Sequence, residues 1–586
     1  MIARSTLIAL LGAAAVLSGC AMARAQVPSA PVPLSSVRDR LPEDEIIYLV
    51  MPDRFDNGDT TNDTGGIAGG PLQTGFDPTH KGFYHGGDLA GLTQRLDYIQ
   101  GLGVTAIWFT PIFVNRPVQG DPGAPEGQLS AGYHGYWATD FTTIDPHLGT
   151  EAEFRAFVDA AHARGMKVYM DIVTNHTADV IRMAECPNSA CPYRSIADYP
   201  DHAYTPVVPA GEAGVKVPAW LNDPQYYHNR GNTTFRGESS TMGDFVGLDD
   251  LATENPRVVS GFIDIYASWI DRFGIDGFRI DTAQHVNPEF WQAFVPAIEA
   301  RARAAGIPNF HIFGEVFNED RDVARQAYWT HAAALPSLLD YAVARTIDEV
   351  AGAAGPTDAF EVTFRGDILY AGGVDRARQM PIFHGNYDAG RFGHFMDVAN
   401  PRASDAERLA RAELANAMLM TMRGVPTIYA GDEQGFTGDG NDQNARQDMF
   451  ASQVASYNDD RLIGTEATTA TANFVTTHPL YQQIATLAAI RRSHPALTRG
   501  RQIVRNAGPT PGLLAISRID PVTGREVVAV FNTSSSAQSG NIIVDRATMR
   551  FTALAGHCPA TVRVAGSAAI TLPAFGYMIC AAEPNA

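Results

Sequence analysis

The chain has 586 residues, of which 64 are acidic and 44 are basic, so its formal net charge is -20. This balance, together with the absence of basic runs, disfavours nucleic acids and anionic lipid surfaces as partners. An acidic surface is also a common solubility feature, so the charge excludes some classes of partner but does not identify one.

The first twenty residues have the pattern of a targeting segment. Arg4 precedes an apolar run, Leu7 to Leu17, which is too short to span a membrane and suits the hydrophobic region of a secretory signal. The segment Leu17-Ser18-Gly19-Cys20 resembles a bacterial lipobox, which predicts a periplasmic, outer-membrane or cell-surface lipoprotein with Cys20 as its mature N-terminus. Ordinary cleavage near Ala23 or Ala25 is the alternative. Residues 21–42, rich in Pro, Ala and Ser, are predicted to form a linker.

Apolar runs alternate with helix-like segments through most of the chain. The runs end near residues 51, 109, 171, 281, 314, 341, 383 and 430. Eight strand–helix alternations predict an α/β fold, a (β/α)8 TIM barrel, which we assign to residues 43–176 and 252–497. Active sites of such barrels collect at the C-terminal ends of the strands, so the polar residues that follow these runs are the site candidates.

Two further regions break this alternation. Residues 177–251 are rich in Pro, Gly, Asn and Tyr and are predicted to be an insertion after the third strand that forms one wall of the cleft. Its aromatic residues Trp220, Tyr226 and Tyr227 either add a stacking surface there or pack within the insertion. Residues 498–586 contain short apolar runs separated by turns, which predicts a small all-β sandwich domain.

Cysteine usage agrees with export. Apart from Cys20, the chain carries Cys186 and Cys191 in a polar loop, and Cys558 and Cys580 near the C-terminus. Local pairing into two disulfides is the simplest arrangement in an oxidising compartment. A zinc site is the alternative, but the first pair lacks the usual tight ligand spacing and the second pair is far away in sequence.

Two motifs, GFRID at residues 277–281 and FGEV at 313–316, each place one carboxylate at the end of a buried strand. Retaining cleavage of a glycosidic bond needs a carboxylate nucleophile and a protonated acid about 5 Å apart, and Asp281 and Glu315 suit these roles. Arg279 points to the same side of its strand as Asp281, so it is expected to keep Asp281 ionised and to leave the proton to Glu315. A strand-end carboxylate alone is more often a helix cap or a surface ion pair.

Four segments together carry a resemblance to a known family. MDIVTNH at 170–176, GFRIDTAQH at 277–285, FGEVF at 313–317 and FHGNYDAGRF at 383–392 are similar, in order and spacing, to the signature regions of the alpha-amylase family, glycoside hydrolase family 13. The resemblance runs from about residue 45 to the C-terminus. It implies that the insertion is the family's domain B.

The resemblance also implies roles for individual residues. Asp281 matches the nucleophile, Glu315 the acid/base and Asp388 the transition-state stabiliser. Tyr136 matches the aromatic platform under the reacting sugar, with core packing as the alternative. The residues expected to bind substrate are Tyr136 together with His134, Asp171, His176, Arg279 and Tyr387.

Calcium is the expected cofactor, at two sites. Residues 52–63 and 85–88 offer hard oxygen donors on short loops, which suit calcium, although acidic turn residues are often only caps. This pattern resembles the N-terminal calcium loop of cyclodextrin glucanotransferases and neopullulanase-like members. The matching positions are Asn57, Asp59, Asn62, Asp63, Gly86 and Asp88. A second site, between domain B and the barrel, is matched by Asn175, Asp250 and His285, the last through its backbone carbonyl.

Two positions depart from the family pattern. Tyr387 stands where members usually carry His before the last catalytic Asp, and Gln284 stands where many carry Lys. Tyr387 is expected to donate a hydrogen bond to the reacting sugar, or else only to fill space beside Asp388. Gln284 is expected to alter contacts on the leaving-group side of the cleft.

The sequence thus predicts an exported, calcium-binding, retaining hydrolase of α-1,4-glucosidic bonds, with starch fragments, maltooligosaccharides or cyclodextrins as substrates. An α-glucan transglycosylase that uses the same covalent intermediate is the alternative. A non-catalytic glucan-binding lipoprotein is disfavoured by the presence of all three carboxylates. No nucleic-acid partner is expected, and contact with a membrane is expected only through the lipid anchor. The sequence does not predict the oligomeric state.

Overall fold

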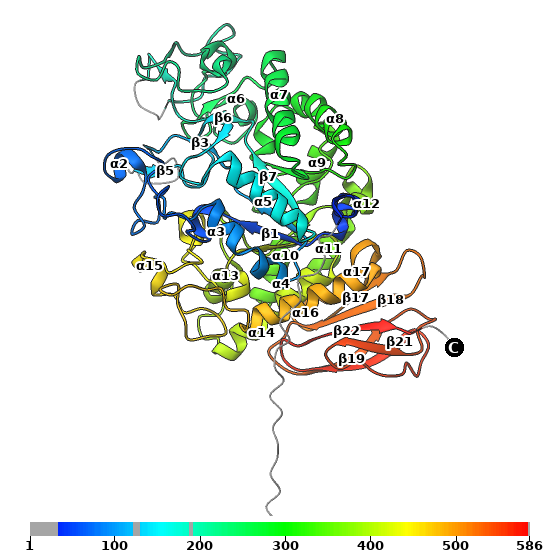
Figure 1. Cartoon of the computed structure of the whole chain (residues 1–586). Coiled ribbons are helices and arrows are strands. Elements are labelled where there is room, and N and C mark those ends of the chain that lie inside the picture. The colour runs from blue at the N-terminus through cyan, green and yellow to red at the C-terminus, as the bar shows by residue number, and fades with distance from the viewer. Residues whose placement is uncertain (1–32, 121–128, 187–190, 584–586) are drawn as a thin grey trace, which may run out of the picture.

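A computed structural model describes residues 33–120, 129–186 and 191–583 (Figure 1). The predicted targeting segment, residues 1–20, lies outside the described residues. None of the helices in the described ranges is long and apolar enough to cross a membrane. The predicted linker, residues 21–42, is wrong in its last part, because α1 (Leu34–Arg38) packs on the barrel. Val37 is fully buried there and Arg38 Nε lies 3.2 Å from Asp276 Oδ1, contacts that a Pro- and Ser-rich composition does not reveal.

Seven parallel strands form the barrel sheet, in the order β13-β12-β7-β2-β1-β15-β14. All residues of these strands are buried, as expected for a parallel sheet that is covered by helices. The (β/α)8-type barrel is thereby confirmed. The strands are β1 (Ile47–Val50), β2 (Ala106–Phe109), β7 (Lys167–Ile172), β12 (Gly277–Ile280), β13 (His311–Gly314), β14 (Pro381–Ile382) and β15 (Val425–Tyr429).

The strand that was expected to end near residue 341 is not formed. Residues 337–340 instead bridge the sheet edges: Gly314 N donates to Ser337 O at 2.9 Å, and Asp340 N donates to Pro381 O at 2.9 Å. Pro336 precedes this segment and lacks an amide donor, and α10 (Tyr341–Ile347) follows directly. A short hydrogen-bonded segment therefore closes the barrel between β13 and β14.

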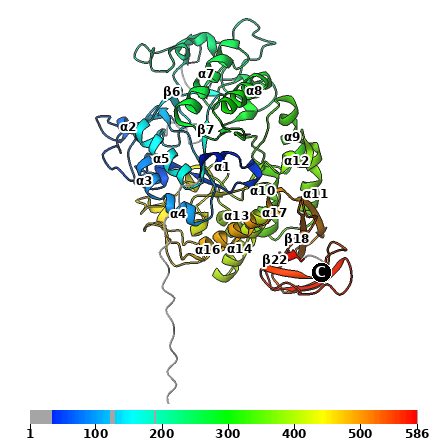
Figure 2. The same cartoon turned by 45° about the vertical axis from the view of Figure 1, so that its right-hand side comes forward.

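Helices cover the outside of the barrel (Figures 1 and 2). In α5, Thr150 and Glu153 form a reciprocal capping box, and the face that carries Phe154, Phe157 and Val158 is buried. The longer helices are α5 (Glu151–Ala163), α7 (Pro256–Phe273), α8 (Pro288–Ala304), α9 (Val323–Ala332), α13 (Phe392–Ala399), α14 (Asp405–Thr421) and α16 (Pro479–Ser493). Shorter ones are α3 (Leu89–Gln94), α4 (Leu96–Gly101), α11 (Ala359–Arg365), α12 (Gly373–Ala377) and α17 (Pro495–Arg499).

Between β7 and α7 the chain leaves the barrel and forms the lobe at the top of Figure 1. β8 (His176–Thr177) pairs antiparallel with β11 (Asp249–Asp250) at the base of the lobe, so the two ends of the predicted insertion, residues 177–251, lie side by side. The lobe contains little regular structure: β9 (Arg182–Met183), β10 (Pro206–Val207) and α6 (Ser239–Met242). Its base stands next to the C-terminal end of β7.

The C-terminal part is an antiparallel β domain, as predicted. Its sheets have the orders β16-β17-β18-β22-β20 and β19-β21, and a separate apolar core includes Val528, Val530, Ile570 and Met578. The strands are β16 (Arg501–Asn506), β17 (Leu513–Ile519), β18 (Glu526–Asn532), β19 (Gln538–Ile543), β20 (Phe551–Ala555), β21 (Ser567–Leu572) and β22 (Tyr577–Ala582). The predicted boundary between the barrel and the β domain, at residues 497 and 498, lies within α17, which packs against β17 of the β domain.

Both predicted disulfides are present. Cys186 pairs with Cys191 in the lobe, and Cys558 pairs with Cys580 in the β domain. Because all four of these sulfur atoms are used in disulfides, the zinc alternative for them is wrong.

Candidate active site

The two central carboxylates follow neighbouring parallel strands. β12 and β13 pair so that Ile280 lies opposite Gly314, and Asp281 and Glu315 therefore leave adjacent strand ends. Their backbones continue the ladder, since Asp281 N donates to Ile172 O at 2.9 Å and Glu315 N donates to Ile280 O at 2.8 Å. Both carboxylates thus lie at the C-terminal end of the barrel strands.

The guanidinium of Arg279 joins three carboxylates. Its Nη1 donates to Asp171 Oδ1 and to Asp281 Oδ1, each at 2.9 Å, and its Nη2 lies 2.9 Å from Glu315 Oε2. Arg279 is only 1% exposed. One planar, permanently charged group therefore positions both strand-end carboxylates relative to each other.

Burial and charge act on these acids in opposite directions. Burial raises the pKa of Asp281 well above its usual range, Arg279 opposes the increase, and Glu315 adds to it. Burial likewise raises the pKa of Asp171 to about 6 against the effect of Arg279. The protons of such a coupled set belong to the set rather than to one residue. The sequence predicts that Arg279 keeps Asp281 ionised and leaves the proton on Glu315. This assignment of protonation states is too simple, because the same guanidinium also contacts Glu315.

Asp388 is held by an arginine that the sequence analysis missed. Arg446 Nη2 lies 3.0 Å from Asp388 Oδ1 and 2.5 Å from Asp442 Oδ1, and its Nη1 donates to Tyr133 Oη at 3.1 Å. Burial raises the pKa of Asp388 to about 7, and Arg446 opposes this increase. Arg446 lies 58 residues beyond Asp388, directly after the short 3-10 turn Asp442–Ala445 and not at a strand end, so no spacing pattern could have found it.

Tyr136 and Tyr387 share Asp171. The two hydroxyls are hydrogen-bonded to each other, and the hydroxyl oxygens of Tyr136 and Tyr387 lie 3.0 Å and 3.4 Å from Asp171 Oδ2, so two hydroxyl protons are shared among three close contacts. Tyr136 lines the cleft, whereas Tyr387 is 1% exposed. The Tyr387 hydroxyl is thus engaged by the protein itself, which favours a positioning role over the expected contact with a sugar.

The two histidines predicted to bind substrate flank Tyr136. His134 Nδ1 accepts from Tyr136 N at 3.0 Å, and His176 Nε2 lies 3.2 Å from Tyr136 O. Burial lowers the pKa of His176 to about 4 and that of His134 well below its usual range. Both rings are therefore neutral at pH 7 and offer uncharged hydrogen-bonding groups.

The strand ends open into a cleft of about 730 Å³. Its lining includes the predicted residues Asp281, Glu315, Asp388, His134, Tyr136, His176, Gln284 and His285. The side chains of Arg279, Asp171 and Tyr387 lie behind this lining and act on it through hydrogen bonds.

Apolar side chains of the insertion form one wall of the cleft, and the sequence analysis missed them. Phe235 and Phe245 both line it, with their ring centroids 5.4 Å apart. Phe235 is 48% exposed and has a φ of 58°, a conformation rare for a bulky residue. Trp220, Tyr226 and Tyr227 are not part of the lining, so the packing alternative holds for these three.

Five of the six residues predicted for the first calcium site, all except Asp59, lie together in the structure. The Asp59 carboxylate instead accepts from Thr61 N at 2.9 Å and from Thr61 Oγ1 at 2.6 Å. Asn57 Nδ2 donates to Asp63 Oδ1 at 2.9 Å, and a Cβ at Gly86 would lie within 2.6 Å of both side chains. The amide oxygens of Asn57 and Asn62 are buried, and neither has a partner among the described residues. Asp88 accepts from Gly58 N, Asp59 N and Gly91 N and caps α3. Buried oxygens that lack hydrogen-bond partners and lie beside carboxylates are suitable ligands for a hard cation.

The second predicted set is only partly assembled. Asn175 Oδ1 is buried and has no partner within the described ranges, which fits a ligand. Asp250, however, is bound by His228 Nδ1 at 2.5 Å, and this contact raises the pKa of His228 to about 10. Asp244, which the sequence analysis missed, is buried and accepts from Asp250 N at 3.3 Å. The His285 side chain faces the cleft, where its Nδ1 lies 2.8 Å from Ser240 O.

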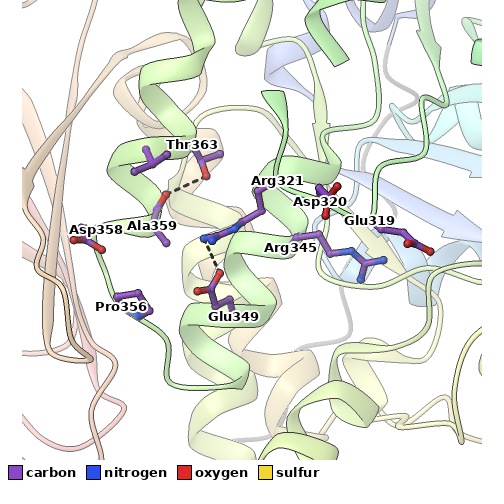
Figure 3. A pocket seen from close by; sticks show the side chains of 10 residues that line it. Glu319, Asp320, Arg321, Arg345, Glu349, Pro356, Asp358, Ala359 and Thr363 are labelled. Carbon is purple, nitrogen blue, oxygen red and sulfur yellow. Dashed lines mark hydrogen bonds and ion pairs between the residues drawn. The ribbon is translucent and has the colours of Figure 1, made fainter. Parts of the chain in front are cut away.

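A second hollow, of about 600 Å³, adjoins the cleft (Figure 3). The two share Glu319 and Asp320 in their linings, and Arg321 and Glu349 form an ion pair of 2.6 Å across the hollow. It contains none of the three catalytic candidates.

The fold and the cleft define a class: a (β/α)8-barrel protein of the glycoside hydrolase type, with carboxylates at neighbouring strand ends. A family model described as the catalytic domain of alpha-amylase matches residues 49–500. The chain belongs to the alpha-amylase family, which confirms the family predicted from the four segments.

Two groups of similar proteins differ in their activity. The chain is 44% identical to an alpha-amylase of Streptomyces lividans over 553 residues, 89% of this chain and 60% of that protein. It is 30% identical to a cyclomaltodextrin glucanotransferase of Geobacillus stearothermophilus over 474 residues, 78% of this chain and 55% of that protein. The chain thus spans little more than half the length of these relatives. The structure of an Anoxybacillus alpha-amylase superposes with a TM-score of 0.70 at 26% identity, covering 94% of this chain and all of the other.

We predict that Tyr387→Phe lowers kcat/KM by about fivefold, because it removes one hydrogen bond, worth about 1 kcal/mol, from the network of Asp171, Tyr136 and Tyr387, while the Tyr136 hydroxyl still bonds to Asp171. Steady-state kinetics on one maltooligosaccharide measure the effect. Tyr481→Phe is the control, because this buried tyrosine donates to Tyr98 O at 2.8 Å and does not line the cleft. A loss greater than about hundredfold would instead support direct contact between this hydroxyl and the transition state.

Proposed function

We propose that the protein is a retaining glycoside hydrolase that cleaves α-1,4-glucosidic bonds in starch fragments, maltooligosaccharides or cyclodextrins. The observation that carries this proposal is the contact of one buried guanidinium, that of Arg279, with both Asp281 and Glu315 at the cleft. Two carboxyl groups that are held by one guanidinium are able to flank a single glycosidic bond, as the retaining mechanism requires.

Glu315 is proposed to give its proton to the glycosidic oxygen as the bond to C1 breaks, while an Asp281 oxygen forms a bond to C1 from the opposite face. Glu315 then takes a proton from water, whose oxygen attacks C1 and releases Asp281. Asp388, held by Arg446, stabilises the positive charge that develops on the sugar ring. Tyr136 offers its ring to the sugar, and neutral His134 and His176 offer hydrogen bonds.

The choice of α-1,4-glucans is supported by the relatives, which include alpha-amylases and cyclomaltodextrin glucanotransferases. A solved alpha-amylase from Geobacillus thermoleovorans, 25% identical to this chain, is complexed with acarbose. The second candidate is a transglycosylase, which would let a sugar hydroxyl take the place of water. The exposed Phe235 favours neither outcome by itself, but it offers a stacking surface for a sugar in the cleft.

We predict that Asp281→Asn lowers turnover of maltoheptaose by more than about a thousandfold and leaves sugar binding intact, because a neutral amide is a poor nucleophile. Chromatography of wild-type products from maltoheptaose and β-cyclodextrin separates the candidates: shorter linear sugars indicate hydrolysis, and longer or cyclic ones indicate transfer. Asp271→Asn, on the outer surface of α7, is the matched control. Residual activity of Asp281→Asn within about tenfold of wild type would contradict the assignment.

Calcium in the loop of Asn57 and Asp63 is proposed as a stabilising cofactor. Such an ion would satisfy the amide oxygens of Asn57 and Asn62 and join the loop to Gly86. We predict that chelator lowers the melting temperature and that calcium restores it, since an ion present at a hundred times its Kd stabilises the native state by about 2.7 kcal/mol.

Asp63→Asn is the informative variant here, because Asn keeps an oxygen that accepts from Asn57 but removes the charge. Asp88 is unsuitable, since it also caps α3. Differential scanning calorimetry should show a smaller calcium-induced shift for Asp63→Asn than for wild type. An equal calcium-induced shift of the melting temperature in the two proteins would show that calcium does not bind in this loop.

Export as a lipoprotein anchored at Cys20 is proposed from the lipobox, and the two disulfides support an oxidising compartment. In a bacterial host, metabolic labelling with palmitate should mark the wild-type protein and not Cys20→Ala. Incorporation into neither protein would favour cleavage near Ala23 or Ala25.

A further inference from the structure

The turn that follows Asp281 has an unusual backbone conformation. Thr282, the next residue, has a φ of 43° and a ψ of 39°, in the left-handed region. Branching at Cβ makes this conformation unfavourable for threonine, so it persists only where the surroundings hold it. Thr282 is half-buried and lines the cleft. A residue held in this way at the edge of a candidate active site is a candidate for a functional role.

Two hydrogen bonds connect Thr282 to the two central carboxylates. Its Oγ1 donates to Asp281 Oδ2 at 3.2 Å, and its backbone N donates to Glu315 Oε2 at 3.0 Å. The side chain of Thr282 thus contacts the proposed nucleophile, while its amide contacts the proposed acid. Both contacts come from one residue, so the positions of the two carboxylates are linked through it.

The two oxygens of Asp281 have different donors. Oδ1 accepts from Arg279 Nη1 at 2.9 Å, and Oδ2 accepts from the hydroxyl of Thr282. Rotation of a carboxylate about its Cβ–Cγ bond has broad energy minima, so a donor on one oxygen alone does not fix the carboxylate plane. A donor on each oxygen does fix it. The Thr282 hydroxyl therefore supplies an orientation that Arg279 alone would leave loose.

We propose that Thr282 is a positioning residue for the retaining reaction, whose hydroxyl fixes the carboxylate plane of Asp281 relative to the Glu315 carboxyl that its own amide holds. This role rests on the proposed function, because orientation of Asp281 matters for the rate only if Asp281 attacks C1. Attack needs an oxygen that is aligned with the breaking bond, and small misplacements of a reacting group lower the rate steeply. A hydroxyl that donates to an ionised carboxylate also forms a stronger hydrogen bond than one between neutral groups.

Packing of the turn is the alternative reason for the conformation of Thr282. Ala283 is fully buried, and its carbonyl accepts from Trp291 Nε1 at 3.0 Å. His285 N donates to Thr282 O at 2.8 Å and closes the turn. A residue needed only for this packing would lower the melting temperature when its side chain is changed. A positioning residue would lower kcat and leave the melting temperature unchanged.

Steady-state kinetics of Thr282→Val and Thr282→Ser on maltoheptaose test the role. Val keeps the branched shape and lacks the hydroxyl, whereas Ser keeps the hydroxyl. We expect Thr282→Val to lower kcat about tenfold with KM within about twofold of wild type, because the lost hydrogen bond aligns Asp281 and does not bind the sugar. Thr282→Ser should keep kcat within about threefold of wild type. Thr486→Val, on the outer surface of α16, is the matched control.

Three outcomes of these kinetics would overturn the role of Thr282. They are a wild-type kcat in Thr282→Val, an equal loss of kcat in Thr282→Val and Thr282→Ser, and a rise in KM at unchanged kcat. The last would mean that the hydroxyl binds the sugar instead of aligning Asp281. Asp281→Asn separates this inference from the proposed reaction: if Asp281→Asn is inactive and Thr282→Val is fully active, only the role of Thr282 fails.

Thr282→Gly guards against a variant that is merely misfolded. Glycine adopts a positive φ without a steric penalty, so this variant should melt at the same temperature as wild type or higher. It lacks the hydroxyl, so its kcat should nevertheless fall by about tenfold or more. Differential scanning calorimetry and kinetics on the same preparation measure both quantities. A Thr282→Gly enzyme with the kcat of wild type would overturn the positioning role.

Discussion

The structure of the active site depends on the charge of Arg279. This side chain is buried at the centre of the strand ends, where it contacts Asp171, Asp281 and Glu315. Removing one partner from a buried ion pair costs about 3–5 kcal/mol, because an uncompensated charge remains. The cluster therefore requires its arginine. The register of β7, β12 and β13 places their carboxylates so that all three contact one guanidinium. Tyr136 and Tyr387 extend the network through Asp171 to the surface of the cleft.

A second arginine holds the third carboxylate of the cleft in a similar way. Arg446 forms ion pairs with both Asp388 and Asp442. The insertion adds an apolar wall through Phe235 and Phe245. The strands fix the carboxylates to a rigid scaffold, whereas loops carry the groups that contact a long substrate, an arrangement common among barrel proteins.

Strand-end residues could be predicted from the sequence because parallel strands bring all their C-terminal ends to one edge. Asp281, Glu315 and Asp171 were found in this way, and the structure brings them together on Arg279. Arg446, Asp244 and Phe235 could not be found, since each lies in an irregular loop whose path is set by tertiary contacts. The sequence predicts a full strand at residues 337–340 because the apolar run there resembles those of the true strands. The proton positions also escaped prediction, since they depend on several acids at once.

In the proposed reaction, Asp281 forms the covalent bond to the sugar while Arg279 holds it beside Glu315. A maltosyl fluoride carrying a second fluorine on the reacting ring would form the intermediate faster than water releases it, so the sugar would stay attached. Mass spectrometry of peptides from the labelled wild-type enzyme then locates the sugar. We predict one maltosyl group per chain, attached to Asp281. Attachment to Asp388 or Glu315, or turnover of the reagent with inverted product and no label, would contradict it.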